Sequence, residues 1–139
     1  MKYRSYSSAV LALCGVILMG MGLYFVFLRP SLLPEDLRFM GVSLSTIQIT
    51  APTLLIWLRR VFWVLGAFVF TSGLLTLSMA LTSFRRQARG GAAVVILAGF
   101  TSVVWMTIVN FLIDSDFKWM LLVLPALWGG ALLLFWFEK

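Results

Sequence analysis

The stretch over residues 9–28 reads AVLALCGVILMGMGLYFVFL, which is 20 consecutive residues without a charge. About 20 apolar residues form a helix that crosses the roughly 30 Å hydrocarbon core of a membrane. Backbone groups inside lipid have to bond within their own segment, and a helix achieves this. Three further stretches of this kind cover residues 61–81, 92–113 and 119–137. The sequence therefore predicts an all-α membrane protein, with four spans in a single domain over residues 1–139.

The composition excludes several classes of protein. Hydrophobic residues make up 62% of the chain and charged residues 12%, and the mean hydropathy is +1.04. Soluble domains carry about 25% charged residues, so an ordinary soluble, disordered or nucleic-acid-binding protein is not expected. With no histidine and one cysteine, the common zinc, haem and iron–sulfur sites lack their ligands, and a Ser-His-Asp mechanism is excluded. We expect no metal, no cofactor, no catalytic residue and no enzyme activity.

The connections predict how the spans are arranged. Short links join the last three spans, and short links are typical of antiparallel neighbours, so we expect an antiparallel four-helix bundle. Cytoplasmic loops carry an excess of Lys and Arg. One side carries Lys2, Arg4, Arg85, Arg86, Arg89 and Lys139, and the other carries Arg29, Arg38, Arg59, Arg60 and Lys118. Because residues 59 and 60 fall on the second helix rather than in a loop, both termini are predicted to be cytoplasmic. The first span is too long for a typical signal sequence and is expected to remain as an anchor.

The loop over residues 29–51 contains a predicted short helix. Pro34 followed by Glu35 and Asp36 is typical of a helix start, and Gly41 is typical of a helix end. The apolar residues that share one face are Leu33, Leu37 and Met40. We expect an amphipathic helix in the bilayer interface, with Glu35 and Arg38 paired on its other face. Residues 42–51 have no clear pattern.

The second predicted helix is longer than a membrane requires. A helix over residues 52–83 would extend about 48 Å. It would then either project from the membrane, or residues 52–60 would lie along the surface and bend near Arg60.

Arg59 and Arg60 stand at this junction, next to Trp63. In one interpretation both arginines extend to lipid headgroups, and Arg59 makes a cation–π contact with Trp63, four residues away. In the other, they join Arg29 or Arg38 across the loop and bind an anionic lipid or ligand. The candidate residues for such a site are Arg38, Arg59 and Arg60.

The polar side chains within the predicted spans are uncharged. No acid or base lies inside them, whereas intramembrane charges usually mark an ion path. Asn110 is the most costly polar residue, and it could form an interhelical bond, lie in the wet interface or line a pore. Trp105 and Trp128 lie deeper than the other tryptophans, and core packing is the expected role of both.

Small residues predict where helices approach closely. The candidate contact points are Gly15, Gly20 and Gly22 on the first span, Gly66 and Gly73 on the second, Ala98 and Ser102 on the third, and Ala126 and Gly130 on the fourth.

Several stretches resemble a group of small bacterial four-span membrane proteins without an established activity. These stretches are LLPEDLRFMG (residues 32–41), WLRRVFWVLG (57–66), TSGLLT (71–76), LTSF (81–84) and DFKW (116–119). The resemblance covers the whole chain and implies a bacterial inner-membrane location. It implies no functional residue.

Three functions are compatible with these features. The first is a non-catalytic accessory or assembly subunit, which contacts the lipid bilayer and other membrane subunits or itself. The second is an oligomeric small channel or transporter lined by Ser, Thr and Asn110. The third is a protein that binds lipid at the outer headgroup layer. The charge-free spans favour the first.

Overall fold

The computed structural model describes residues 5–88 and 90–138, and within these ranges every regular element is a helix. The elements are α1 (Tyr6–Leu23), η1 (Tyr24–Leu28), α2 (Pro34–Met40), α3 (Leu44–Thr50), α4 (Leu54–Met79), η2 (Ala80–Phe84), α5 (Gly91–Gly99), η3 (Phe100–Val104), α6 (Trp105–Leu112) and α7 (Lys118–Phe137), where η marks a π-helical turn. The all-α prediction is confirmed for these residues. Lys2, Arg4, Arg89 and Lys139, which the topology prediction counts, lie outside the described residues.

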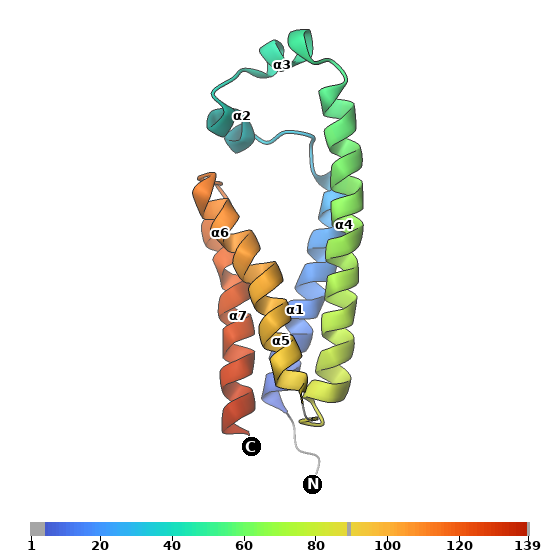
Figure 1. The fold of residues 1–139 in the computed structure, drawn as a ribbon, viewed down its shortest axis with the longest axis vertical. Coiled ribbons are helices and arrows are strands. Elements are labelled where there is room, and N and C mark those ends of the chain that lie inside the picture. The colour runs from blue at the N-terminus through green and yellow to red at the C-terminus, as the bar shows by residue number, and fades with distance from the viewer. Residues whose placement is uncertain (1–4, 89, 139) are drawn as a thin grey trace.

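Four helices in the described part of the chain are long and apolar enough to cross a membrane. They cover Tyr6–Leu28, Leu54–Phe84, Gly91–Leu112 and Lys118–Phe137, and the first three each include a π-helical turn. The second helix begins before the predicted span and runs through Arg59 and Arg60 without interruption. Residues 54–60 therefore continue the axis of α4 (Figure 1) and do not bend aside near Arg60.

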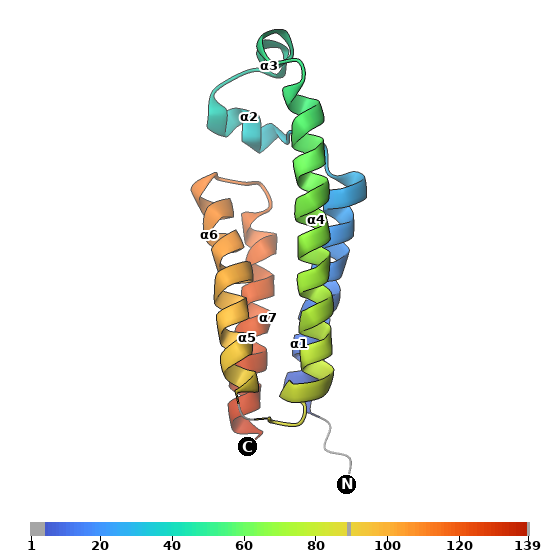
Figure 2. The same ribbon diagram turned by 45° about the vertical axis from the view of Figure 1, so that its right-hand side comes forward.

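The other long helices pack against two sides of α1. One side of α1 packs along α4 and another side packs on α7, while α5 and α6 pack against α7. The connection with α2 and α3 lies at one end of the molecule, called here the α2 end (Figures 1 and 2). The other end, called the terminal end, holds Ser5 and Glu138, which are hydrogen-bonded to each other.

Glycines let the backbones of α1 and α4 touch. A Cβ atom on Gly22 would lie 2.7 Å from the carbonyl oxygen of Gly66, and one on Gly73 would lie 2.6 Å from that of Gly15. Both distances are shorter than van der Waals contact, so no side chain fits. The predicted contact points Gly66 and Gly73 are confirmed, whereas a Cβ on Gly20 would meet nothing within 4 Å.

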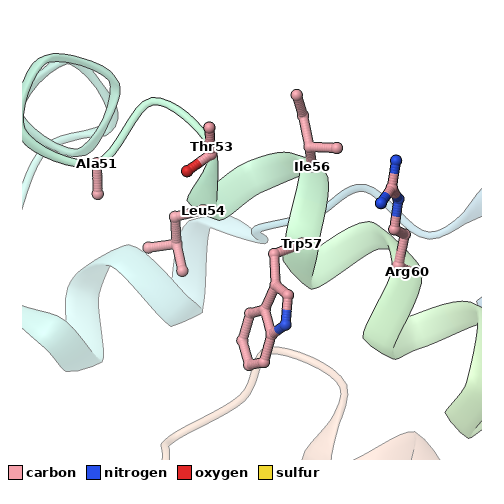
Figure 3. A pocket seen from close by; sticks show the side chains of 6 residues that line it. All are labelled: Ala51, Thr53, Leu54, Ile56, Trp57 and Arg60. Atoms are coloured by element: carbon pink, nitrogen blue, oxygen red, sulfur yellow. The ribbon is translucent and has the colours of Figure 1, made fainter.

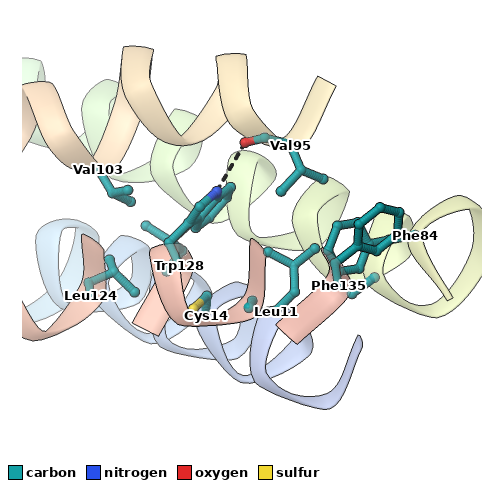
Figure 4. Packing of buried hydrophobic residues seen from close by; sticks show 11 residues of the cluster. Leu11, Cys14, Phe84, Val95, Val103, Leu124, Trp128 and Phe135 are labelled. Atoms are coloured by element: carbon teal, nitrogen blue, oxygen red, sulfur yellow. Dashed lines mark hydrogen bonds between the residues drawn. The ribbon is translucent and has the colours of Figure 1, made fainter. Parts of the chain in front are cut away.

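The buried core joins α1, α7 and α5 with the end of α4. Trp128 is 4% exposed, and its Nε1–H donates a 3.0 Å hydrogen bond to the Val95 carbonyl oxygen (Figure 4). Gly99 makes room for this indole, because a Cβ there would collide with Nε1. Trp105 is 59% exposed, so the expectation that it packs in the core is wrong.

The loop helices follow local signals. α2 begins at Pro34, as predicted, and ends before Gly41, which adopts the left-handed conformation with φ 67°. α3 was not predicted. Its N-terminus is capped by Ser43, whose side-chain oxygen accepts the Thr46 N–H at 3.1 Å, which is a standard way to satisfy a free donor in the first turn.

Candidate functional site

Glu35 fastens α2 to the connection between α6 and α7. It lies in the first turn of α2, is 2% exposed, and accepts a 3.2 Å hydrogen bond from the hydroxyl of Ser115. Ser115 is also 2% exposed, and its Oγ accepts the Phe117 N–H. The α6–α7 connection thus covers the face of α2 that the sequence analysis treated as solvated. The expected Glu35–Arg38 pair is wrong for this reason.

Arg38 instead pairs across the surface with Asp116. The shortest distance from its guanidinium to a carboxylate oxygen is 2.6 Å, and the two side chains are 60% and 56% exposed. The hydrogen bond to Asp116 is the main cause that raises the pKa of Arg38. Exposed pairs of this kind add little stability. Any anion that bound Arg38 would have to compete with this carboxylate.

Arg29 holds three segments together. Its guanidinium lies 3.3 Å from a carboxylate oxygen of Asp36 and stacks on the ring of Phe62, with 3.6 Å between its central carbon and the ring centroid. Asp36 also accepts the Leu33 N–H at 2.8 Å. The side chain of Arg29 is only 9% exposed. Arg29 therefore joins the end of η1 to α2 and α4, and does not offer a free charge to a ligand.

Arg59 and Arg60 are the exposed α4 arginines of the predicted site. The ion pairs among the described residues engage Arg29, Arg38 and Lys118, and none engages Arg59 or Arg60. The cation–π contacts of the same residues involve Arg29 and Lys118, so the expected Arg59–Trp63 contact is not formed. The structure does not join either arginine to Arg29 or Arg38, which have carboxylate partners of their own.

The surface of α4 is hollowed beside Arg60. Two adjoining open hollows of ≈ 550 and ≈ 560 Å³ share Trp57 and Arg60 in their lining. The first extends from them to Ala51 (Figure 3), and the second extends along α4 to Phe68. In Figure 3, the side chains of Arg60 and Trp57 point in different directions from neighbouring turns of α4, and both line the first hollow. Arg60 thus stands at the edge of an apolar surface that begins at Trp57.

Asn110 is occupied by its own helix. Its side-chain amide donates a 2.9 Å hydrogen bond to the Met106 carbonyl, and the residue is half-buried. Hydroxyl side chains in the long helices also donate to the carbonyl four residues earlier; they are Ser72, Thr76, Thr82, Thr101, Ser102 and Thr107. Such bonds satisfy a polar group in an apolar helix. Within the described residues, no group of three or more acids or cysteines is placed to hold a metal ion.

The terminal end holds a cluster that the sequence analysis missed. One carboxylate oxygen of Glu138 accepts hydrogen bonds from the hydroxyls of Ser7 and Ser5, at 2.6 and 3.0 Å, and the other accepts the Ser7 N–H at 3.1 Å. Burial acts to raise the pKa of Glu138, but the bonds from Ser7 and Ser5 outweigh it, and the pKa lies below its ordinary value. An acid beside the N-terminus of α1 also favours the helix dipole. The helix start at Ser5 was the available signal, but its partner lies at the far end of the chain.

Glu138 is expected to make stability depend on pH. Since its pKa is lowered on folding, the stabilisation is fully present above the pKa of the unfolded chain and is lost as the pH falls through the folded value. Replacement of Glu138 by glutamine should therefore lower the melting temperature in detergent at neutral pH, and the difference from wild type should shrink in acid. Ser7→Ala should weaken the same pH dependence. A difference that stays constant over the whole pH range would contradict the assignment.

Scans against protein-family models, curated proteins and solved structures each give no match to the chain.

Proposed function

We propose that the chain is a non-catalytic accessory or assembly subunit of the bacterial inner membrane. Its four long helices would cross the bilayer as an antiparallel bundle, with both termini cytoplasmic and α2 in the opposite interface. The observation that carries the proposal is the bonding of the intramembrane polar groups. Asn110 and the hydroxyls of α4, η3 and α6 donate to carbonyls of their own helices.

This bonding favours a structural role over a conducting one. A path for ions or polar solutes needs polar groups that face the path and exchange partners with the solute. Side chains bonded to the carbonyl one turn earlier serve the helix instead. The predicted spans within the long helices also carry no acid or base. A proton-coupled mechanism would require such a group. The chain would therefore act through its surface.

The outer side of α7 offers a surface for a partner helix. A Cβ on Gly129 or Gly130 would meet nothing within 4 Å, and Ala126 is exposed. Ala126 and Gly130 are four residues apart and share one face. In membranes such faces allow close helix approach. The glycines of the α1–α4 contact are already covered, whereas this face is free to contact another subunit or a second copy of the chain.

The proposal is tested by purification in mild detergent with mass spectrometry and native mass measurement. We expect a stoichiometric partner chain, or a homo-oligomer without flux activity. Gly130→Leu should reduce recovery of the complex by about tenfold, as expected for loss of roughly 1.4 kcal/mol of packing. Gly20→Leu is the matched control, because Gly20 is equally open but lies on α1.

Two outcomes would overturn the proposal. One is a monomer without any partner. The other is solute flux in liposomes that Asn110→Leu abolishes, because that result would establish the channel or transporter alternative.

A further inference from the structure

The outer surface of α4 carries an apolar stripe next to Arg60. Trp57, Val61, Val64 and Phe68 are spaced by four, three and four residues, so they share one side of the helix. They are 59%, 37%, 58% and 70% exposed, and no other described element covers them. The second hollow lies along this stripe, and the first meets the stripe at Trp57. The stripe is defined by these four residues.

Arg60 lies at the depth of lipid headgroups. The helix from residue 60 to Phe84 extends about 36 Å, and the basic turn that begins at Arg85 follows it directly. The hydrocarbon core of a bilayer is about 30 Å thick. With Phe84 at one boundary of this core, Arg60 reaches the headgroup layer on the other side. Val61, Val64 and Phe68, which follow Arg60 along α4 toward Phe84, then lie at the depth of the acyl chains.

Arg60 lacks a carboxylate from its own chain. The acids described at the α2 end are Glu35, Asp36, Asp114 and Asp116, and each already has a partner: Ser115, Arg29, Lys118 and Arg38 respectively. A counter-charge for Arg60 must therefore come from another molecule. A planar guanidinium binds a phosphate group through two parallel hydrogen bonds.

The two adjacent arginines differ in their relation to the stripe. At 100° per residue, Arg60 lies about 60° around the helix from Trp57, whereas Arg59 lies about 160° from it. Gly66, nine residues from Trp57, lies on the side opposite to the stripe and contacts α1. Arg59 is therefore on the far side of α4 from the stripe. Neither arginine has a carboxylate partner among the described residues, but of the two Arg60 alone adjoins the apolar stripe.

We propose that Arg60 and the stripe bind one anionic phospholipid from the leaflet at the α2 end. The phosphate contacts the guanidinium of Arg60, and an acyl chain lies along Val61, Val64 and Phe68. The indole of Trp57, almost one turn farther from the core than Arg60, lies at the headgroup level, where tryptophan is favoured. The positive charge at only one end of the stripe fits an amphiphile better than a helix from a partner, which would require apolar contact along its whole length. The site is independent of the partner surface on α7.

The test compares lipid retention by native mass spectrometry. The whole protein is placed in nanodiscs that contain equal amounts of phosphatidylglycerol and phosphatidylcholine and is then released. We expect wild type to retain phosphatidylglycerol preferentially, and Arg60→Gln to reduce that preference about fivefold, the effect of one surface arginine. Arg59→Gln removes the same charge one residue away and should behave as wild type. Phe68→Ala should reduce retention of both lipids equally.

Three results would overturn the site. The first is equal retention of the two lipids by wild type. The second is an equal loss of preference in Arg59→Gln and Arg60→Gln, which would indicate general attraction by charge. The third is a protein chain that remains bound to the stripe in place of lipid and is released by Phe68→Ala. Unchanged melting temperatures of both arginine variants establish that each comparison is made on folded protein.

Discussion

Replacement of Gly22 by alanine is expected to destabilise the protein by about 2–3 kcal/mol, near the upper end for overpacking of a core. The added methyl would lie 2.5 Å from the backbone nitrogen of Phe70 and 2.7 Å from the carbonyl oxygen of Gly66. Both are backbone atoms of α4, which cannot rotate out of the way as a side-chain tip can. The two helices would have to separate, and the neighbouring contact between Gly15 and Gly73 would weaken with them.

Gly20→Ala is the matched control for this prediction. Gly20 is on the same helix two residues earlier, and a Cβ there meets nothing within 4 Å. Alanine favours a helix over glycine by about 1 kcal/mol, so this variant should be unchanged or slightly more stable. The two variants thus differ in sign, and thermal unfolding in detergent followed by circular dichroism measures both. A loss of stability that is the same in both variants would show that α1 and α4 do not touch at Gly22.

The close contact between α1 and α4 was only half predictable. Gly15 and Gly22 are seven residues apart, as are Gly66 and Gly73, and two turns of helix bring each pair onto one face. Antiparallel packing then matches the first glycine of one pair with the second of the other. Gly20 is also a glycine on the first span, but it lies on another face of the helix. The sequence marks which residues are small, but the pairing depends on the relative rotation of two helices, which is a tertiary property.

The charges at the α2 end show a similar limit. The helix from Pro34 to Met40 was predictable, because its start and its end depend on local signals at Pro34 and Gly41. The partners of its charged side chains were not predictable, since Glu35 and Arg38 bond to Ser115 and Asp116, about 80 residues away. Spacing within a helix identifies pairs that are close by construction. Such spacing does not predict whether a loop distant in sequence packs on the helix and offers the same side chains other partners.

Arg59 and Arg60 were predicted as equivalent candidates because both are basic, adjacent and next to tryptophan. The structure separates them by the side of α4 on which each lies, and it pairs Arg38 with Asp116. A continuous helix through residues 52–60 would have predicted the sides of α4 on which Arg59 and Arg60 lie. The obstacle was that the sequence left a bend near Arg60 as an open alternative.

Replacement of Trp128 by alanine is expected to destabilise the protein by about 3 kcal/mol, the lower end of the range for a buried tryptophan replaced by alanine. Lipid tails are as apolar as the core, so transfer from water does not supply this energy. The cost arises from lost packing, because the indole fills the space between α5, α7 and α1, where it is 4% exposed. A void there leaves its lining without contact atoms on one side.

The indole N–H makes a separate, smaller contribution. Trp128→Phe keeps much of the ring volume but removes the donor to the Val95 carbonyl, and a hydrogen bond of this kind contributes about 1 kcal/mol. Gly99→Ala should destabilise more than Trp128→Phe does, because its methyl collides with the indole and forces it out of place.

Trp105→Ala is the matched control for Trp128→Ala. Both tryptophans lie well inside predicted membrane spans, but Trp105 is 59% exposed. Without the indole, detergent or lipid contacts the helix surface in its place and no void forms. We therefore expect the free energy of unfolding to change by less than about 1 kcal/mol. Denaturation by a strong detergent, followed by circular dichroism, compares the four variants without relying on tryptophan fluorescence. Equal losses in Trp105→Ala and Trp128→Ala would contradict the packing of α7 against α5 and α1, because that packing buries Trp128 and not Trp105.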